Sequence, residues 1–454
     1  MTAHQNQSET RDPGQLIDHG SWSTYQKLLV FGTALTIILD GVDNQLLPNA
    51  IPTLIREWNQ PRAEFINALA FGPFGMMVGG LLGGIIGDRF GRRPALLGSV
   101  LTFGIVTIGI AFVNSIEMLG WLRFFAGLGL GGAMPNAATL ASEYVPIRQR
   151  PFAVTLTIVC IPLGGALAGE VAAMVIPTHG WRMLFLIGGI VPIVASAALW
   201  MLLPESPKFL ARHRERWPEL TRILRRSGHQ VPENVTYAVA TGDAKGGSIG
   251  QLLAGGLARD TVGLWVAFFF GLMVNYVIIL LLPALLTSAS VGFAQPVASR
   301  ALAMSNYGGV VAAVLGAVAV QRFGSRVAML GMAVASIVCG LVLSRWPLDP
   351  SQTVGLMVMF LLTGGLVNGV QTTMYALAAH IYPTHIRSTG VGTAVAIGRV
   401  GNVLAAYAGA FAIDRSGAPG YFALWSILMF FVLIALAVIR RHVPAAEQAR
   451  AASV

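Results

Sequence analysis

Apolar segments long enough to cross a membrane recur twelve times along this chain, in two groups of six. A hydrocarbon layer about 30 Å thick needs about 20 apolar residues in a helix. Only 11% of the residues are charged, well below the roughly one quarter that is typical of soluble domains. We therefore predict an all-α membrane protein of twelve transmembrane helices in two pseudo-symmetric six-helix bundles. The predicted spans are 27–47, 64–87, 95–113, 118–141, 152–176, 183–203, 261–286, 298–320, 327–345, 353–380, 389–413 and 421–439.

The segment between the two groups differs in composition from both. Residues 204–260 are rich in charge, glycine and proline, which is typical of a solvated connector, and we expect some amphipathic helix after Pro204. The predicted layout is a tail at 1–24, an N-terminal bundle at 25–203, the connector at 204–260, a C-terminal bundle at 261–441 and a tail at 442–454.

Positive charge is distributed unevenly among the loops. Of the 30 Lys and Arg residues, 22 fall in the tails, the connector and alternate loops, whereas six fall in the opposite loops. Loops rich in Lys and Arg stay in the cytoplasm, so both termini are predicted to be cytoplasmic. The net charge of +10 therefore indicates topology, and no nucleic-acid partner is expected. The polar N-terminal tail lacks the apolar core of a signal peptide, so we expect the first span to be retained.

The two halves of the sequence repeat each other. The run from Asp88 to Arg93 returns as Gln321 to Arg326, and Pro146 with Arg150 returns as Pro383 with Arg387. Many secondary transporters are built from such repeats, with the ligand site at mid-depth between them. The repeat therefore predicts a central site shared by both bundles.

Two carboxylates, Asp40 and Asp43, lie inside the first apolar segment. Asp40 is roughly 20 Å along a helix that starts near Lys27, and a charge at this depth normally faces a polar cavity and has a function. The two residues are three apart, so they lie about 60° apart on one helix face. Two carboxylates that are close together and out of water can share a proton. We predict that one of them carries protons, and the alternative is a purely structural pairing; the sequence does not decide which acid dominates.

Arg123 and Glu170 are two further charges inside predicted spans. Arg123 lies roughly 10 Å inside the outer end of its helix, at about the level of Asp43. For Glu170 three interpretations remain: a second proton site, a partner of Arg123 or Arg182, or a residue of the outer vestibule.

Arg399 lies roughly 18 Å along its helix from Arg387, and thus near mid-depth. A guanidinium group there can hold a carboxylate in bidentate geometry. The C-terminal half has no acid at comparable depth, which favours an anionic substrate; an ion pair with a helix 1 acid is the alternative. Aromatic and amide residues at mid-span are predicted to line the same site, because a ring wants stacking walls and a few hydrogen-bond donors. The candidates are Gln371, Tyr375, Tyr276, Asn275, Asn306 and Asn136.

The run from Gly84 to Arg93 (GIIGDRFGRR) resembles the loop between helices 2 and 3 of the major facilitator superfamily. Three further runs resemble the aromatic acid:proton symporters of that superfamily: Asp40 to Asp43 (DGVD), Arg123 to Gly132 (RFFAGLGLGG) and Tyr382 to Gly392 (YPTHIRSTGVG). The sequence departs from the pattern at three places. Gln321 replaces the acid in the second copy of the loop motif, His380 stands where an acid is frequent, and Pro151 stands where a glycine commonly follows the arginine.

The resemblance implies the major facilitator fold and a division of labour among the charged residues. Arg123 would pair with a helix 1 acid, and protonation of that acid would release it. The inward face would be gated by a charge cluster comprising Asp88, Arg89, Arg92, Arg93, Glu143, Arg150 and Arg387.

The function that the resemblance implies is proton-coupled import of a small aromatic carboxylate, hydroxybenzoate-like, by alternating access across a bacterial inner membrane. A monomer without cofactor or metal is expected to suffice. The alternatives are symport or export of another organic anion, such as a dicarboxylate or sugar acid, and a membrane sensor that does not translocate. An enzyme is not expected, because the sequence shows no nucleophile motif, no metal-binding spacing and no phosphate-binding loop.

Overall fold

The computed structural model describes residues 10–232, 235–237, 248–383 and 386–445. Within these residues, nine long helices make up most of the chain. In the first half they are α2 (Thr24–Glu57), α3 (Ile66–Phe90), α4 (Arg92–Ile110), α5 (Ile116–Tyr144) and α6 (Arg150–Leu202). In the second half they are α10 (Ala258–Leu286), α11 (Gln295–Arg345), α12 (Thr353–Ile381) and α13 (Arg387–Val438).

Three of the nine helices are sharply bent, and the bends account for the twelve predicted spans. The non-helical residues are Gly180 in α6, with φ 77°, Gly324 in α11, with φ 79°, and Ser416 with Gly417 in α13, where the glycine has φ 61°. Glycine adopts positive φ without steric cost, so the chain can change direction sharply at these residues between two helical segments. Each bent helix therefore supplies two spans. Eight of the nine helices, all except α5, are long and apolar enough to cross a membrane by length and composition among the described residues.

Helix α2 is longer than the sequence predicted. The predicted span ended at residue 47, whereas the helix continues through Pro48 and Pro52 to Glu57. Proline removes one backbone donor and kinks a helix, but packing against neighbouring helices can hold the helix together. Ala50, Ile51 and Leu54 beyond the first proline are fully buried, and their burial explains why the helix does not end there.

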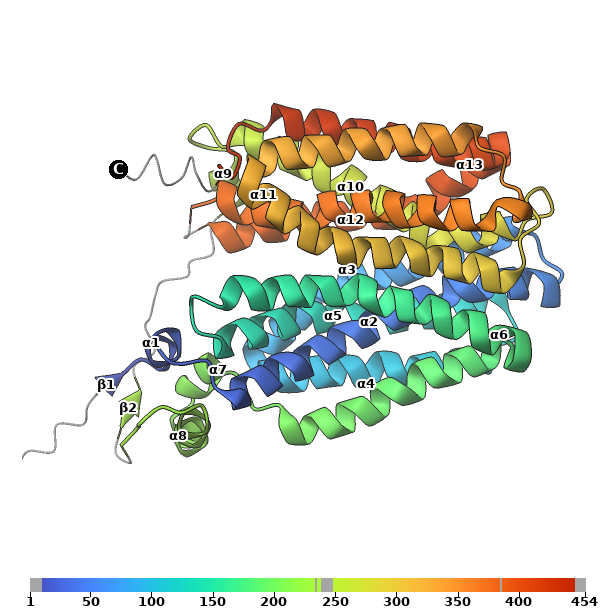
Figure 1. Ribbon diagram of the computed structural model, residues 1–454. Coiled ribbons are helices and arrows are strands. Elements are labelled where there is room, and N and C mark those ends of the chain that lie inside the picture. Colours follow the sequence, from blue (N-terminus) through green and yellow to red (C-terminus); the bar gives the residue numbers. More distant parts are fainter. Residues whose placement is uncertain (1–9, 233–234, 238–247, 384–385, 446–454) are drawn as a thin grey trace, which may run out of the picture.

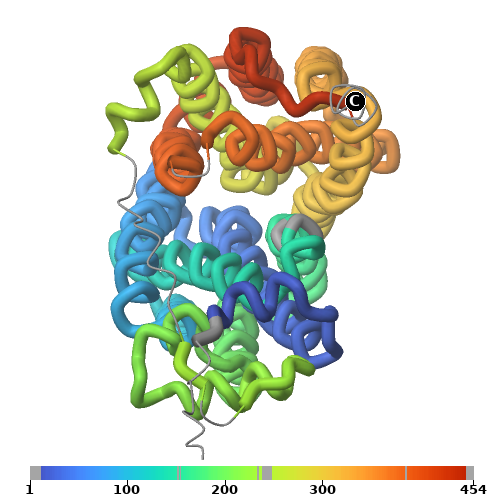
Figure 2. Tube along the Cα trace, turned by 90° about the vertical axis from the view of Figure 1, so that its left-hand side faces the viewer, coloured from blue at the N-terminus to red at the C-terminus, as the bar shows by residue number. Residues whose placement is uncertain are grey.

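Helices α2 to α6 form one half of the molecule and α10 to α13 form the other (Figure 1). Figure 2, viewed from the end that carries the described chain termini, shows the two groups of helices on opposite sides of the molecule. Glycines let helices within a half approach closely. A Cβ atom on Gly79 of α3 would lie 2.7 Å from the Cα atom of Leu128 in α5, so no larger residue fits. This pairing of α3 with α5 fixes the orientation of both helices.

The N-terminal tail and the first part of the connector pack together on the first half, whereas Ile249–Leu252 near the end of the connector lies against the second half (Figure 1). The tail contains β1 (Thr10–Arg11) and α1 (Pro13–Asp18), and β1 pairs in parallel with β2 (Thr236–Tyr237) of the connector. The connector also contains α7 (Pro207–Ala211), α8 (Trp217–Arg226) and α9 (Ile249–Leu252), and short 3₁₀ turns lie at η1 (Arg62–Phe65), η2 (Arg214–Arg216) and η3 (Pro350–Gln352).

Helix α8 is the amphipathic helix expected after Pro204. It buries Leu220, Ile223 and Leu224. Part of the predicted C-terminal tail, 446–454, lies outside the described residues, as do Thr384 and His385 of the third resemblance run.

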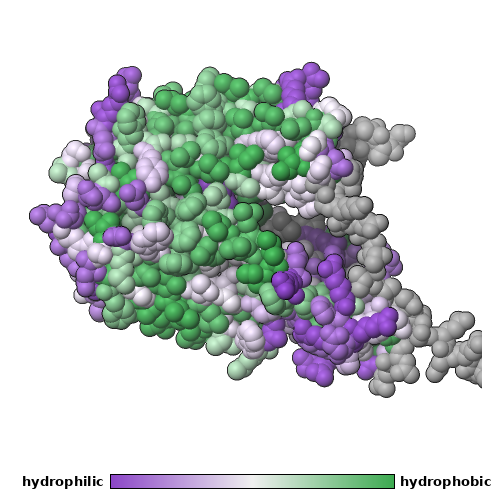
Figure 3. All heavy atoms as spheres, turned by 180° about the vertical axis from the view of Figure 1, so that it is seen from behind, coloured by the Kyte–Doolittle hydropathy of each residue, from purple (hydrophilic) through white to green (hydrophobic). Residues whose placement is uncertain are grey.

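The two ends of the molecule differ in how the halves meet. At the end opposite the termini, Arg62 forms an ion pair with Asp414, Arg300 Nε lies 3.6 Å from Glu170 Oε2, and the Tyr407 hydroxyl donates to Asn67 Oδ1 at 3.0 Å. Among the described residues, the other hydrogen bonds that cross between the halves lie at mid-depth or towards this same end. Figure 3 shows an apolar surface around the middle of the molecule and a recess between the halves at the end that carries the termini.

Candidate functional site

A cavity lies between the two halves at mid-depth, with walls of different chemistry. The wall from α5 and α6 is apolar and consists of Leu130, Met134, Ile158, Ile161 and Pro162. The wall from the second half is rich in amides, hydroxyls and one guanidinium, and its polar members are Asn275, Tyr276, Asn306, Asn368, Gln371, Thr372, Tyr375, Arg399 and Asn402. Such a cavity fits a ligand with an apolar face and polar groups directed to one side.

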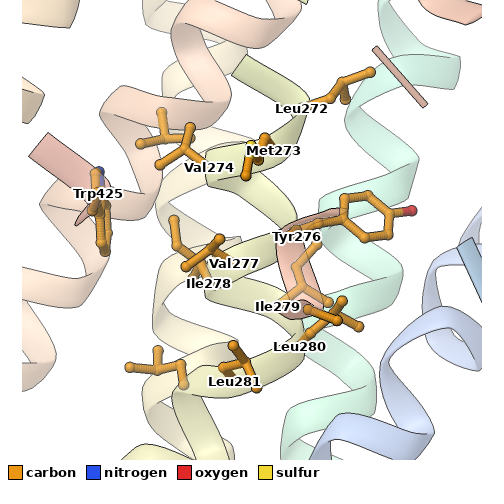
Figure 4. Packing of buried hydrophobic residues seen from close by; sticks show 14 of the residues in the cluster. Leu272, Met273, Val274, Tyr276, Val277, Ile278, Ile279, Leu280, Leu281 and Trp425 are labelled. Atoms are coloured by element: carbon orange, nitrogen blue, oxygen red, sulfur yellow. The ribbon is translucent and has the colours of Figure 1, made fainter. Parts of the chain in front are cut away.

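Helix α10 shows how one element supplies both packing and lining. Some of its buried aliphatic residues lie on the side of Trp425 of α13, whereas Tyr276 points to the other side together with Leu272 (Figure 4). The Tyr276 hydroxyl accepts a hydrogen bond from Asn44 Nδ2 at 3.2 Å, across the boundary between the halves. The aliphatic face of α10 therefore holds the helix in place, and Tyr276 faces the cavity.

Arg399 reaches from the second half into the first. Its Nη1 donates a hydrogen bond to the backbone oxygen of Met76 in α3 at 2.9 Å. The absence of a side chain at Gly80 makes this possible, because a Cβ atom there would overlap Nη1 and lie 2.8 Å from Cζ of Arg399. Arg399 is thus a cavity residue that also joins the halves.

The two helix 1 acids have different surroundings. Asp40 lines the cavity, is only 5% exposed, and has no hydrogen-bond partner for Oδ1 among the described residues. Asp43 is fully buried outside the cavity, where Arg123 Nη1 lies 3.2 Å from its Oδ2 and Thr107 Oγ1 donates to its Oδ1 at 2.5 Å. Asp40 therefore faces the cavity, and Asp43 is the partner of Arg123.

Gly41 explains how α2 presents these two acids to different surroundings. A Cβ atom on Gly41 would lie 3.1 Å from the Cα atom of Gly164 in α6, so α2 and α6 touch backbone to backbone at this level. This contact fixes the rotation of α2 about its axis. Asp40 and Asp43 both lie on the part of α2 that is turned away from this contact, about 60° apart.

Amide pairs close the cavity on the side away from the termini. Gln45 Nε2 donates to Asn306 Oδ1 at 3.0 Å, and Asn306 Nδ2 donates to Gln45 Oε1 at 2.9 Å. Further towards that end, Gln295 Nε2 donates to the backbone oxygen of Asn49 at 3.4 Å. These three hydrogen bonds join the halves on the side of the cavity away from the termini, and any opening of this end must break them.

The position of Asn136 corrects one sequence-based expectation. It was predicted to line the substrate site, but it is fully buried away from the cavity. Its Nδ2 donates to the backbone oxygens of Gly83 and Gly132 at 2.9 and 2.8 Å, and its Oδ1 accepts from Arg92 Nη1 at 3.2 Å. Because both its amide nitrogen and its amide oxygen have partners in α3, in α5 and at the start of α4, Asn136 has a structural role here.

Glu170 lies at the end opposite the termini, apart from the buried Asp43 pair. Its observed ion partner is Arg300, and both side chains are partly exposed. Neither partner considered from the sequence contacts it, since Arg123 pairs with Asp43 and Arg182 Nη1 pairs with Glu57 Oε1 at 2.6 Å. Of the interpretations left open, the structure places Glu170 in an exposed contact between the halves.

The predicted gating residues lie at the end that carries the termini, and their contacts stay within one half. Asp88 forms an ion pair with Arg92, and Arg89 lies over the Phe90 ring. Arg150 binds Asp18 of the tail and donates through Nε to the Ser142 backbone oxygen at 3.0 Å.

The remaining gating candidates bind partners within their own half or in the connector. Arg93 binds the backbone oxygen of Trp200, and the Ser206 hydroxyl donates to Glu143. Arg387 Nε donates to the Tyr382 backbone oxygen at 3.4 Å, within the second half.

Several site residues were missed by sequence reasoning. Glu205 is 1% exposed, and its Oε1 accepts from the backbone N–H groups of Arg92 and Arg93 at 2.8 and 3.1 Å, which caps the start of α4. Asn44 and Gln45 directly follow Asp43, and Asn368 is one helical turn before Gln371. The sequence contained a signal for these three amides, because polar residues inside apolar spans, like charges, are costly there and are usually functional.

A fold of two repeated helix bundles around a mid-depth cavity defines a membrane transporter of the major facilitator class. Among solved structures, the xylose transporter XylE from E. coli in a partially occluded inward-open conformation matches with a TM-score of 0.74 at 18% identity, over 92% of this chain and 99% of that one. A bacterial homologue of the lysosomal transporter Spinster, in an inward-facing conformation, matches with a TM-score of 0.67 at 16% identity, over 92% and 97% of the chains. These likenesses confirm the predicted fold.

The chain belongs to the family described as "Sugar (and other) transporter", whose model matches residues 56–442. The 4-hydroxybenzoate transporter PcaK of Acinetobacter baylyi is 32% identical, over 94% of this chain and 92% of that one. PcaK of Pseudomonas aeruginosa is 35% identical over 88% and 89%, and the gallate transporter of Pseudomonas putida is 30% identical over 92% and 93%. The predicted resemblance to aromatic acid transporters of the major facilitator superfamily is thereby confirmed, and the protein is a transporter.

Proposed function

We propose that this protein imports a small aromatic carboxylate, hydroxybenzoate-like, together with protons, across the inner membrane of a bacterium. The observation that carries the proposal is the mid-depth cavity that Arg399 and an apolar wall from α5 and α6 line together. The names of the relatives, which include transporters of 4-hydroxybenzoate, gallate and benzoate, support the aromatic class. We propose that both termini are cytoplasmic, as the distribution of positive charge indicates.

The substrate would be held by two complementary contacts. Its ring would lie against the apolar wall that includes Met134 and Ile161, and its carboxylate would engage the guanidinium of Arg399. Binding would require Arg399 to exchange its hydrogen bond to the Met76 backbone for the stronger, charge-assisted bond to the carboxylate. Substrate binding would thereby release a contact between the halves.

Proton coupling would use the helix 1 acids. Arg123 and Asp43 form a buried ion pair, and a pair of this kind is stable only while both members are charged. Protonation of Asp43 would neutralise one partner and free Arg123, which would favour a different arrangement of α2 and α5. Asp40, which lines the cavity beside the substrate position, is the second candidate for the proton site.

Alternating access follows from the asymmetry between the two ends. The contacts Arg62–Asp414 and Glu170–Arg300 close the end opposite the termini, which in the proposed topology is the outer end. The structure then corresponds to an inward-facing state, and return to the outward-facing state would break these contacts. One chain contains the whole cavity, so a monomer suffices for this cycle.

The test is uptake into proteoliposomes that contain the purified protein. With an inward proton gradient, labelled 4-hydroxybenzoate should accumulate, and a protonophore should abolish the accumulation. Competition with unlabelled benzoate, gallate, succinate and gluconate distinguishes an aromatic carrier from a carrier of dicarboxylates or sugar acids. Saturable binding without counterflow would indicate a sensor, and a failure of every aromatic acid to bind would refute the substrate class.

A further inference from the structure

Gln371 of α12 is a buried amide whose two polar atoms both lack a partner. It lines the cavity and is only 7% exposed. The Tyr375 hydroxyl lies near the amide, one turn further along α12, but neither Nε2 nor Oε1 has a partner at hydrogen-bonding distance among the described residues. Buried polar groups in proteins are nearly always hydrogen-bonded, so each exception calls for an explanation. Asn402 of α13, which is 6% exposed, also presents an unpartnered Oδ1 atom in this cavity wall.

The neighbouring amides do not share this property. Asn275 Nδ2 donates to Asn368 Oδ1 at 2.9 Å, and Asn368 Nδ2 donates to the Gly364 backbone oxygen at 2.9 Å. Asn306 is paired with Gln45 across the halves. The fold thus satisfies the other amides of this wall from within and leaves Gln371 to be satisfied by whatever occupies the cavity.

We propose that Gln371, together with Asn402, forms a subsite for a neutral hydroxyl group on the ring of the substrate, separate from the carboxylate site at Arg399. An amide oxygen needs a hydrogen-bond donor and an amide nitrogen needs an acceptor. A carboxylate can only accept, and an unsubstituted ring edge offers neither function, whereas a hydroxyl group provides both. Because both atoms of Gln371 lack partners, the conclusion is the same for either orientation of the amide.

The subsite makes the ring substituent a determinant of specificity. This inference rests on the proposed function, since it assumes that an aromatic carboxylate occupies the cavity. When an unsubstituted ring displaces water from the site, the amide atoms stay buried and unpaired, whereas a hydroxylated ring pairs with them. Leaving a buried hydrogen-bonding group unpaired weakens binding about tenfold or more, so hydroxybenzoates should bind at least tenfold more tightly than benzoate.

The experiment measures equilibrium binding of benzoate, 3-hydroxybenzoate and 4-hydroxybenzoate to the purified full-length protein and to the variant Gln371→Leu. Leucine keeps a similar volume but offers no hydrogen bond. The measured quantity is the ratio between the affinity for the better hydroxybenzoate and the affinity for benzoate. In the variant Gln371→Leu this ratio should fall to about twofold or less. The affinity for benzoate itself should rise, because leucine leaves no buried polar group unpaired, and saturable benzoate binding also shows that the variant is folded.

Two further variants keep the test decisive. Gln352→Leu makes the same substitution outside the cavity, at a glutamine that accepts a hydrogen bond from Trp346, and should keep the wild-type preference. If Gln371→Leu does not fold, Asn402→Ala replaces it, and a reduced preference is again expected. An unchanged preference, or an equal loss of affinity for all three acids, would overturn the subsite while leaving the transport function intact. A wild-type protein that binds none of the acids would instead refute the proposed function.

Discussion

The variant Gly80→Ala should remove the contact between Arg399 and the first half without disturbing the fold. The three atoms nearest to a Cβ atom at this position all belong to the Arg399 guanidinium group, with Cζ at 2.8 Å and Nη2 at 3.1 Å. This group is the end of a flexible side chain, so it can move away while the backbone of α3 stays in place. The hydrogen bond from Nη1 to the Met76 oxygen, 2.9 Å long, is then lost.

The size of the effect follows from the kind of bond. A hydrogen bond from a charged group contributes about 1.5–3 kcal/mol net. Because this bond joins the two halves in the present conformation, its loss should favour the opposite conformation by the same free energy, which is about 10- to 150-fold in the equilibrium between the two states.

The assay is the accessibility of a cysteine placed where only the opposite conformation exposes it. Ser299 is fully buried against Gly169 at the end of the cavity away from the termini. In a background without Cys160 and Cys339, Ser299→Cys should react with a membrane-impermeant thiol reagent at least about tenfold faster when Gly80→Ala is present. Gly98→Ala is the matched control, since a Cβ atom there would meet nothing within 4 Å. Equal labelling rates in Gly80→Ala and the control would refute the reasoning.

Three further variants test individual site residues. Asp43→Asn should abolish accumulation driven by a proton gradient while leaving substrate exchange measurable in proteoliposomes, and normal accumulation would contradict the coupling role. Arg399→Ala should weaken binding of an aromatic carboxylate at least about tenfold, because it removes a charge-assisted bond; an unchanged dissociation constant would count against Arg399 as the anchor. Asn136→Ala should lower the free energy of unfolding by about 1–3 kcal/mol, because it leaves buried partners unpaired, yet substrate affinity in the folded fraction should not change. A selective loss of affinity would restore Asn136 to the substrate site.

Much of the candidate site could be found in the sequence because the bilayer makes polar residues conspicuous. A charge inside an apolar span is costly and therefore informative, and this reasoning picked out Asp40, Asp43, Arg123 and Arg399 before any contact was known. Five of the amide and aromatic residues predicted to line the cavity do so, namely Asn275, Tyr276, Asn306, Gln371 and Tyr375.

Asn136 shows the limit of reasoning from depth alone. It lies in an apolar span as predicted, but it points to the glycines of α3 and not to the cavity. A helix rotated by half a turn would satisfy the same sequence pattern, and the pattern does not fix that rotation. Packing against a neighbouring helix fixes it.

The sequence by itself determined the number of spans, the pairing of the two halves and the presence of charges inside the spans. These features follow from hydropathy and internal repetition, which are local properties of the chain. Of the five charges that the sequence picked out, Glu170 lies in a partly exposed contact and not at depth. The division of labour between the two helix 1 acids was decided only by the tertiary structure. Gly41 against Gly164 sets the rotation of α2, which directs Asp40 to the cavity and Asp43 to Arg123. Contacts between residues more than a hundred positions apart in the chain decide this rotation, and no single segment contains them.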